Sequence, residues 1–110
     1  MTCDQANFSG CEFDTQPVRS HPAAASPYGA LNMAGNLAEW MADWYAADYY
    51  ATAPCINPPG PPAGTHRVMR GGSWSSHIRY IRTASRRGSD PGFACLFHGE
   101  GFRCAASDQE

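Results

Sequence analysis

A pair of glycines inside a strand-like segment places the strongest constraint on how this chain folds. Residues 67–74 read as a strand that runs into Gly71 and Gly72 and ends at Trp74. Glycine weakens a strand unless another part of the backbone has to approach it closely. We therefore expect a second chain segment to cross at the glycine pair, with Trp74 packed into the core.

The rest of the chain is rich in turn-forming residues. The 110 residues include 11 Gly and 9 Pro, which favours irregular loops over long helices within one domain or part of one. Residues 1–27 read as loop, and the Pro-rich residues 51–66 keep too few backbone donors to enter a sheet interior. Further along, we expect a short strand or turn at 78–82, a loop at 88–99 and a closing strand at 101–105.

The segment from Asn36 to Tyr45 fits two kinds of secondary structure. Trp40 and Trp44 are four residues apart, as on one face of a helix. Leu37, Glu39 and Met41 alternate with their neighbours, as in a strand. Periodicity leans slightly towards the helix and leaves both alternatives open.

Charge and hydropathy exclude some classes of function. The net charge of −2 lacks the basic excess of a nucleic-acid binder. The chain shows neither an apolar run of membrane-spanning length nor an apolar signal-peptide segment. All eight basic residues are Arg, and seven of them lie between Arg67 and Arg103. These arginines reflect either coding bias together with structural ion pairs or a basic patch that faces a ligand.

The five cysteines are an odd number, so at least one thiol has no partner within the chain. The sequence contains no Cys-X-X-Cys pair and no cluster of Cys with His, so nothing in it indicates a zinc site. Cys3 and Cys11 are the pair that proximity favours for a disulfide.

Three motifs, taken in order, identify a family resemblance. They are Gly35–Trp40, Arg70–Trp74 and Gly101–Arg103, with Asp43-Trp44-Tyr45 and Asn57–Pro61 between the first two. Together they resemble the C-terminal half of the formylglycine-generating enzyme, or sulfatase-modifying factor, domain, a variant of the C-type-lectin fold.

The match extends over residues 6–106 and implies an α+β domain with an irregular antiparallel sheet and long loops. It favours a strand at 36–45. It also implies that residues 1–110 are the C-terminal part of a domain normally about twice as long, and hence incomplete and marginally stable.

The loop before Trp40 carries oxygen atoms of the kind that calcium prefers. Asn32, Asn36 and Glu39 supply two amides and one carboxylate around Gly35. Taken alone, such a loop also serves simply to turn the chain. The resemblance implies a structural calcium held by the Asn32 side chain, the carbonyls of Gly35 and Leu37, and the Glu39 carboxylate. Ala38 departs from the family pattern, which usually has an aromatic residue there.

The residues that would make such a domain an oxidase differ in this chain. Enzymes of the family oxidise a sulfatase cysteine with copper(I) held by two cysteines shortly after the Arg-Gly-Gly-Ser motif. The resemblance places Ser76 and Ile81 at those positions. A hydroxyl is a poor ligand for copper(I), and Ile offers no ligand. His21, His66, His77 and His98 are scattered without the spacing of metal ligands, so we expect no copper and no oxidase activity.

We therefore predict a non-catalytic, calcium-stabilised domain that presents residues 75–80 and 88–99 to a protein or glycan ligand. The predicted ligand-binding residues are Ser75, Ser76, His77, Tyr80, Phe93, Leu96, Phe97 and His98. The alternatives are part of an oxidase that acts on a protein cysteine, and a structural fragment with no activity of its own.

A fourth reading is a binding protein diversified by a retroelement, because variable proteins of that class are similar in fold. Residues 75–99 lack Lys, Glu, Gln, Met and Trp. Mutation of the adenines in Asn codons cannot produce these five residues.

Overall fold

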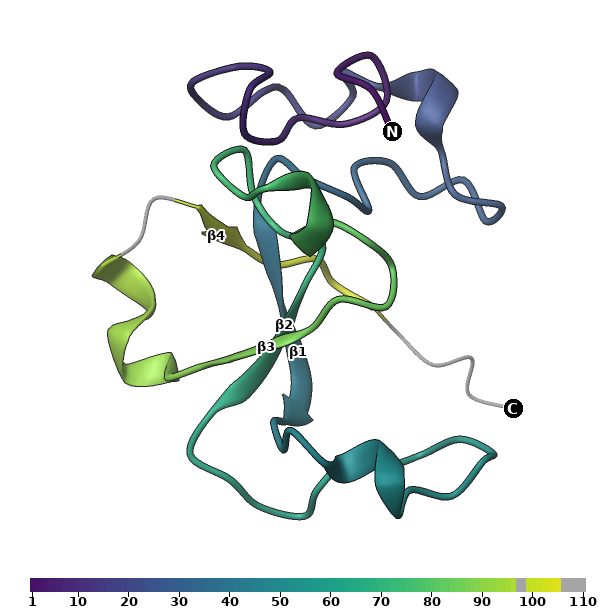
Figure 1. Cartoon of the computed structure of the whole chain (residues 1–110), viewed down its shortest axis with the longest axis vertical. Coiled ribbons are helices and arrows are strands. Elements are labelled where there is room, and N and C mark those ends of the chain that lie inside the picture. Colours follow the sequence, from purple (N-terminus) through teal and green to yellow (C-terminus); the bar gives the residue numbers. More distant parts are fainter. Residues whose placement is uncertain (97–98, 106–110) are drawn as a thin grey trace.

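The computed structural model describes residues 1–96 and 99–105, and it shows a small α+β fold built on one four-stranded sheet (Figure 1). The strands lie in the order β3-β2-β1-β4. Their bounds are β1 Ala38–Trp44, β2 Arg67–Arg70, β3 Arg87–Ser89 and β4 Glu100–Gly101. The helical segments in the described residues are 3-10 helices: η1 Pro22–Ala24, η2 Tyr49–Ala51, η3 Ile78–Tyr80 and η4 Pro91–Leu96.

The sheet is mixed. β1 and β2 are antiparallel, with Trp40 opposite Met69, and β2 and β3 are antiparallel, with Met69 opposite Arg87. β4 instead runs parallel to β1, with Ala38 opposite Glu100. The predicted α+β fold with an irregular antiparallel sheet is thus confirmed in class, and the sheet is mixed because of this parallel edge. A parallel pair needs a long connection, and the chain between β1 and β4 is long enough to supply it.

Most of the observed elements are of the predicted type, but their lengths differ from the prediction. Residues 38–44 form a strand paired on both sides, which settles the ambiguity against a helix. β2 stops at Arg70 because Gly71 and Gly72 adopt left-handed φ values of 83° and 68°. Residues 78–80 form a 3-10 turn, and residues 87–89 pair as a strand within a stretch expected to be loop.

The close approach expected at the glycine pair is confirmed. A Cβ atom on Gly71 would lie 3.2 Å from the carbonyl oxygen of Met33. On Gly72 it would lie 2.8 Å from Cγ2 of Ile81. Trp74 is half-buried rather than fully enclosed, and its backbone N–H donates to the Asn36 carbonyl over 2.9 Å.

The hydrophobic core is small for a chain of this length. The buried apolar residues that the structure describes are Ala6, Ala38, Val68, Met69 and Ile81. The accessible surface is 8115 Å², against about 6,000 Å² for a self-contained protein of this mass. The excess leaves many large apolar side chains in contact with water.

Phe102 is one of those exposed side chains. It is 78% exposed, so its predicted place in the core is wrong. The reason is that β4 ends at Gly101, which packs closely on Leu37 and leaves the next residue outside the sheet.

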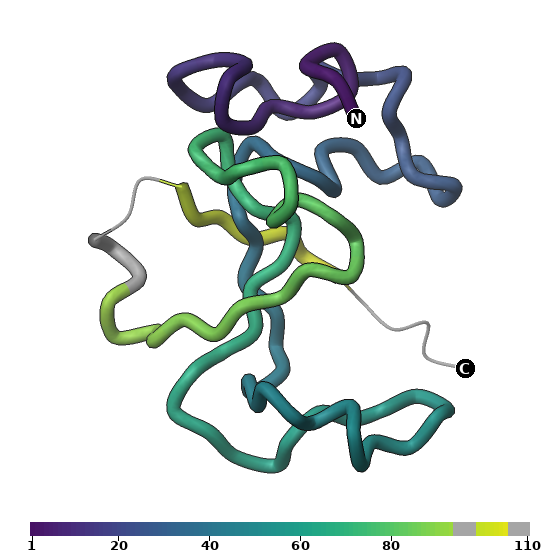
Figure 2. Tube along the Cα trace, viewed as in Figure 1, coloured from purple at the N-terminus to yellow at the C-terminus, as the bar shows by residue number. Residues whose placement is uncertain are grey.

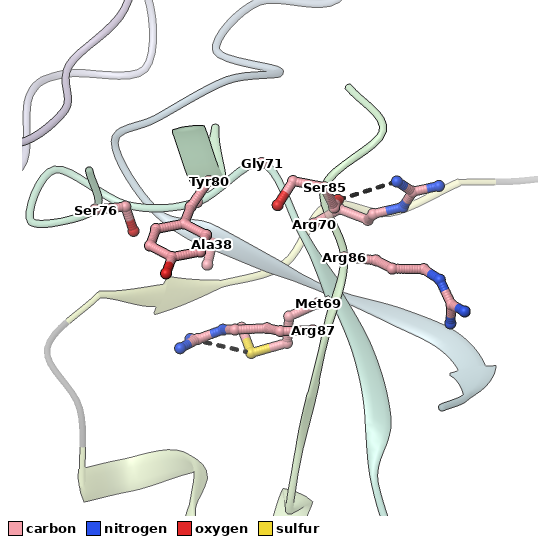
Figure 3. A pocket seen from close by; sticks show the side chains of 10 residues that line it. Ala38, Met69, Arg70, Gly71, Ser76, Tyr80, Ser85, Arg86 and Arg87 are labelled. Atoms are coloured by element: carbon pink, nitrogen blue, oxygen red, sulfur yellow. Dashed lines mark hydrogen bonds between the residues drawn. The ribbon is translucent and has the colours of Figure 1, made fainter. Parts of the chain in front are cut away.

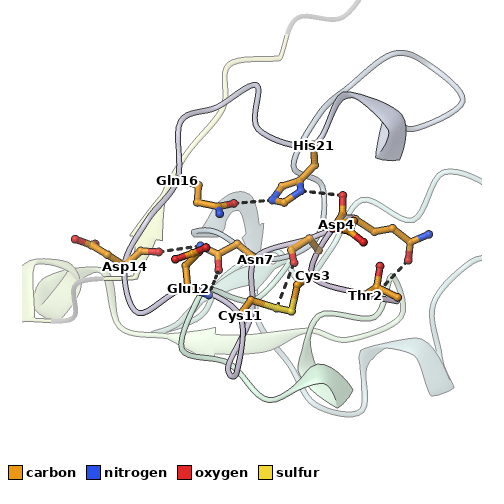
Figure 4. The surroundings of a disulfide bond; sticks show 11 residues. Thr2, Cys3, Asp4, Asn7, Cys11, Glu12, Asp14, Gln16 and His21 are labelled. Atoms are coloured by element: carbon orange, nitrogen blue, oxygen red, sulfur yellow. Dashed lines mark hydrogen bonds between the residues drawn. A yellow bond between two sulfur atoms is a disulfide. The ribbon is translucent and has the colours of Figure 1, made fainter.

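Residues 1–30 form an irregular layer over one end of the sheet (Figure 2). A disulfide joins Cys3 to Cys11 within it, with a Cα–Cα distance of 5.4 Å (Figure 4). The loop that this disulfide closes donates from Ser9 N–H to the Ser76 carbonyl over 3.0 Å, and its Asn7 carbonyl accepts from Asn36 N–H over 2.8 Å.

Two buried polar side chains hold this layer together internally. The Asn7 side chain donates to the Asp14 carbonyl over 2.8 Å and accepts from Glu12 N–H over 3.3 Å. The His21 ring lies between the Asp4 carbonyl at 3.0 Å and the Gln16 side-chain oxygen at 2.7 Å.

Within the described part of the chain, no helix has the length and apolar character needed to span a bilayer.

We predict that replacing both bridged cysteines, as Cys3→Ser with Cys11→Ser, lowers the free energy of unfolding by about 2.5 kcal/mol. That figure is the entropy of closing so short a loop in the unfolded chain. Urea unfolding followed by tryptophan fluorescence measures it. Cys55 and Cys104 are exposed free thiols, so Cys55→Ser with Cys104→Ser is the matched control and should change little. Equal losses in the two double variants would contradict the prediction.

A second prediction concerns Gly35, which has a φ of 76° and whose added Cβ would lie 2.1 Å from the Asn7 carbonyl oxygen. Gly35→Ala should cost about 3 kcal/mol or more, since left-handed strain adds to a direct backbone clash. Gly10 has a φ of 99° and open space around it. Gly10→Ala therefore isolates the strain and should cost about 1 kcal/mol. Similar melting temperatures for the two variants would show that the clash is relieved without cost.

Candidate functional site

The four residues predicted to bind calcium are brought together in the structure. Asn32, Gly35, Leu37 and Glu39 all line one cavity of about 410 Å³. Left-handed φ values of 53° at Asn32 and 76° at Gly35 curl the loop around this space. The sequence spacing therefore translates into one concave site rather than an extended segment.

The Asn32 side chain carries a buried oxygen atom that has no hydrogen-bond partner among the described residues. Its side-chain N–H donates to the Val18 carbonyl over 3.0 Å. Its Oδ1 atom is buried and accepts no hydrogen bond from the described residues. An unsatisfied buried acceptor costs about 1–3 kcal/mol. A bound cation would offset that cost.

Glu39 is held by Arg103. The Nε and Nη2 atoms of Arg103 donate to the two carboxylate oxygens of Glu39, and Nη2 also donates to the Leu31 carbonyl over 3.1 Å. The hydrogen bonds that Arg103 donates to Glu39 raise the pKa of Arg103 above its usual value, with desolvation acting in the opposite direction. The expected pairing of Arg103 with a carboxylate or a carbonyl is thus confirmed, with both. Each carboxylate oxygen keeps a second lone pair, so this ion pair does not consume the carboxylate.

The chemistry of the donor set fits calcium. It combines one carboxylate, one amide oxygen and backbone carbonyls, all hard oxygen ligands. No cluster of three or more His, Cys, Asp or Glu side chains that could hold a metal ion occurs among the described residues, so the set depends on amide and backbone oxygens beside the single carboxylate.

The two positions that the resemblance assigns to copper are packed in other ways. The Ser76 hydroxyl accepts from Ser73 N–H over 3.0 Å and lies 3.2 Å from the Ser73 hydroxyl. Ile81 is 2% exposed and packs against Gly72. The free thiols that the structure describes, Cys55 and Cys104, are both exposed at other places in the chain.

A second cavity, of about 240 Å³, opens beside Ser76 at the end of β2 (Figure 3). We call it the β2-end cavity. Ala38 lies in its wall, where the family pattern has an aromatic residue. The side chain missing at position 38 therefore corresponds to space in the structure. The other lining residues are Met69, Arg70, Gly71, Gly72, Ser76, Tyr80, Ser85, Arg86 and Arg87.

The predicted ligand-binding residues divide into three groups. Ser76 and Tyr80 line the β2-end cavity, and Ser75 and His77 are exposed next to them. Phe93, which is 59% exposed, lies on η4 and outside that lining. The Leu96 side chain and residues 97–98, which include Phe97 and His98, lie outside the described part of the structure.

Sequence reasoning missed Arg70, Ser85, Arg86 and Arg87 as lining residues of this cavity. The clustering of arginines after residue 66 was the signal that could have found three of them. The register β2–β3 was needed to place Arg87 opposite Met69.

Comparison with known proteins relates the chain to one family and to several of its members. Residues 4–108 match the family described as the sulfatase-modifying factor enzyme 1-like domain. The serine/threonine-protein kinase pkn1 of Chlamydia caviae is 45% identical over 103 residues, which are 92% of this chain and 16% of that protein. The formylglycine-generating enzyme of Thermomonospora curvata is 44% identical over 98 residues, covering 84% of this chain and 31% of the enzyme.

The solved structure of Treponema denticola variable protein 1 superposes with a TM-score of 0.75 at 32% identity. The match covers 90% of this chain and 34% of that one. The chain thus spans about a third or less of each of these three proteins.

Proposed function

The chain belongs to the sulfatase-modifying factor enzyme 1-like family, and on that premise we propose that it is a non-catalytic binding domain stabilised by calcium. Its ligand, a protein or a glycan, contacts residues 75–80 and the β2-end cavity beside them.

The observation that carries this proposal is the packing at positions 76 and 81. Copper(I) requires soft thiolate ligands. A hydroxyl in a serine hydrogen-bond cluster and a buried Ile side chain replace them here. Restoring copper chemistry would require two substitutions and repacking around Gly72.

The calcium part of the proposal is supported by the shared cavity and by the unpartnered Oδ1 of Asn32. Asn32 and Glu39 would supply side-chain oxygens, and Gly35 and Leu37 would supply carbonyls. A bound calcium would hold the loop in its left-handed turns and would add positive charge near Arg103 and Glu39.

Two relatives favour alternatives that a test must separate. Similarity to a formylglycine-generating enzyme supports part of an oxidase acting on protein cysteine. Similarity to Treponema denticola variable protein 1, with the restricted residue alphabet of 75–99, supports a retroelement-diversified binding protein. A near-copy of the codons for residues 70–103 close to the gene, with Asn codons at the differing positions, would establish the second alternative.

We predict that saturating calcium stabilises the protein, by about 2.7 kcal/mol at a concentration one hundred times the Kd. Differential scanning calorimetry with and without calcium measures the rise in Tm. Asn32→Ala with Glu39→Ala should abolish this rise. Asn57→Ala with Glu12→Ala removes the same two groups elsewhere and should keep it. The calcium-dependent shift is compared within each variant, because losing Glu39 also leaves Arg103 without its carboxylate. A full shift in the Asn32/Glu39 variant would refute the assignment.

We also predict that the protein neither retains copper(I) against a chelator nor converts the cysteine of a sulfatase peptide to an aldehyde. Chelator competition and mass spectrometry of the peptide are the two measurements. The Cys55→Ser, Cys104→Ser variant serves as the control for copper bound at the surface thiols. Aldehyde formation by the wild-type chain would overturn the non-catalytic proposal.

A further inference from the structure

The near-neutral charge of the chain conceals a strongly basic segment. Residues 67–90 contain six Arg and only one acidic residue, Asp90, a balance of +5. Residues 1–66 contain one Arg and six acidic residues, a balance of −5. The segment that borders the β2-end cavity is therefore the positive part of an otherwise acidic protein.

Most of these arginines make contacts that hold the guanidinium group in place without neutralising its charge. Among the described residues, Arg87 alone of the six forms an ion pair with a carboxylate, that of Glu100. Arg70 donates to the carbonyls of Thr83 and Ser85 over 2.8 and 3.0 Å. The remaining four bind carbonyl oxygens, a Tyr hydroxyl or aromatic faces: Arg67 at Ala42 and Trp44, Arg79 at Tyr80, Arg82 at the Arg79 carbonyl, and Arg86 at Ala47, Tyr45 and Tyr50.

Those partners fix the guanidinium groups without cancelling their charge. Five of the six arginines are thus not in the structural ion pairs that the sequence left open as one explanation. The alternative explanation, a basic patch that faces a ligand, fits the contacts.

Arg87 is the arginine best placed to bind a ligand at the β2-end cavity. Its side chain is 60% exposed, and its Nη2 atom donates to Glu100 Oε1 and to Met69 Sδ over 3.3 and 3.5 Å. The Glu100 side chain is only 5% exposed and so acts as a fixed anchor. Nε and Nη1 of Arg87 have no partner among the described residues, which leaves their N–H groups free to donate.

The surroundings of Arg87 combine an apolar wall with a further donor. Ala38 and Met69 are buried and form the wall, and the Tyr80 ring lies across from Arg87 (Figure 3). The Tyr80 hydroxyl accepts from Arg79 Nη2 over 2.7 Å and keeps its own hydrogen to donate.

We propose that the β2-end cavity is a subsite for a carboxylate side chain from an acidic segment of a protein partner, bound by Arg87 and Tyr80, which both line it. A guanidinium group donates charge-assisted hydrogen bonds to a carboxylate, and the methylene groups of a Glu side chain suit the Ala38–Met69 wall. This subsite deepens the proposed binding function and rests on it.

A protein segment fits better than a long polyanion. The cavity of about 240 Å³ is below the size range of sites for whole small-molecule ligands. An extended nucleic acid or sulfated glycan would also run over residues 1–66, whose balance of −5 repels it. A short acidic segment contacts the basic region alone.

The test uses a fluorescein-labelled peptide of alternating Glu and Ala, with its Gln and Ala counterpart as the uncharged control. Fluorescence anisotropy with the whole chain at saturating calcium gives the Kd. We expect the Glu peptide to bind and to weaken as salt rises, and the Gln peptide not to bind. Arg87→Gln should weaken binding about tenfold or more, because charge-assisted hydrogen bonds are lost.

Arg19→Gln is the matched control, since it removes the same charge outside the basic segment and should change the Kd less than about twofold. Arg87→Lys keeps the charge but not the planar pair of donors, and it should lie between wild type and Arg87→Gln. Near-UV circular dichroism confirms that each variant is folded, and Arg87→Lys replaces Arg87→Gln in the comparison if the latter is not.

Three results would overturn the subsite. They are equal binding of the Glu and Gln peptides, equal losses for Arg87→Gln and Arg19→Gln, and tighter Arg87-dependent binding of heparin or of a single-stranded oligonucleotide than of the peptide. If any of these results is found while calcium still stabilises the protein and no aldehyde forms, the subsite proposal fails and the proposed function stands. If the protein forms the aldehyde, the proposed non-catalytic function fails.

Discussion

The backbone contact between Asn7 and the Gly35–Asn36 turn supports the rest of the structure. Asn36 donates its N–H to the Asn7 carbonyl, and its own carbonyl accepts from Trp74 N–H. Its side chain bonds both backbone groups of Gln16, accepting from N–H over 2.7 Å and donating to the carbonyl over 3.0 Å. One residue with a φ of 66° thus joins the N-terminal layer, the loop before β1 and the segment after β2.

Polar contacts of this kind matter because apolar burial is limited. With few fully buried hydrophobic side chains and a large accessible surface, the chain relies on backbone pairing, on buried amides such as Asn7, and on the Cys3–Cys11 bridge to position its loops. Close contacts at Gly35, Gly71 and Gly72 make this pairing geometrically feasible, because a Cβ atom at each would meet a neighbouring segment.

Sequence reasoning grouped the residues predicted to bind calcium better than it grouped the residues that line the β2-end cavity. The predicted calcium ligands lie within eight residues of one another, so local turn geometry is enough to bring them into one loop. The β2-end cavity depends on residues distant in sequence, where Arg87 on β3, Met69 on β2 and Ala38 on β1 share one face through strand register. Phe102 shows the same limit, since its exposure follows from the early end of β4.

The sequence by itself determined the family and the close crossing at Gly71–Gly72. Each of these depends on residue identity or short spacing. Only the tertiary structure decided that β4 pairs parallel with β1 and that Arg103 holds Glu39. It also decided that five of the six arginines of 67–90 face carbonyls, a hydroxyl or rings, while Arg87 pairs with Glu100. The physical reason is that a guanidinium group takes whichever acceptor the fold brings within reach. Composition counts charges, and only the folded arrangement determines which of them are neutralised.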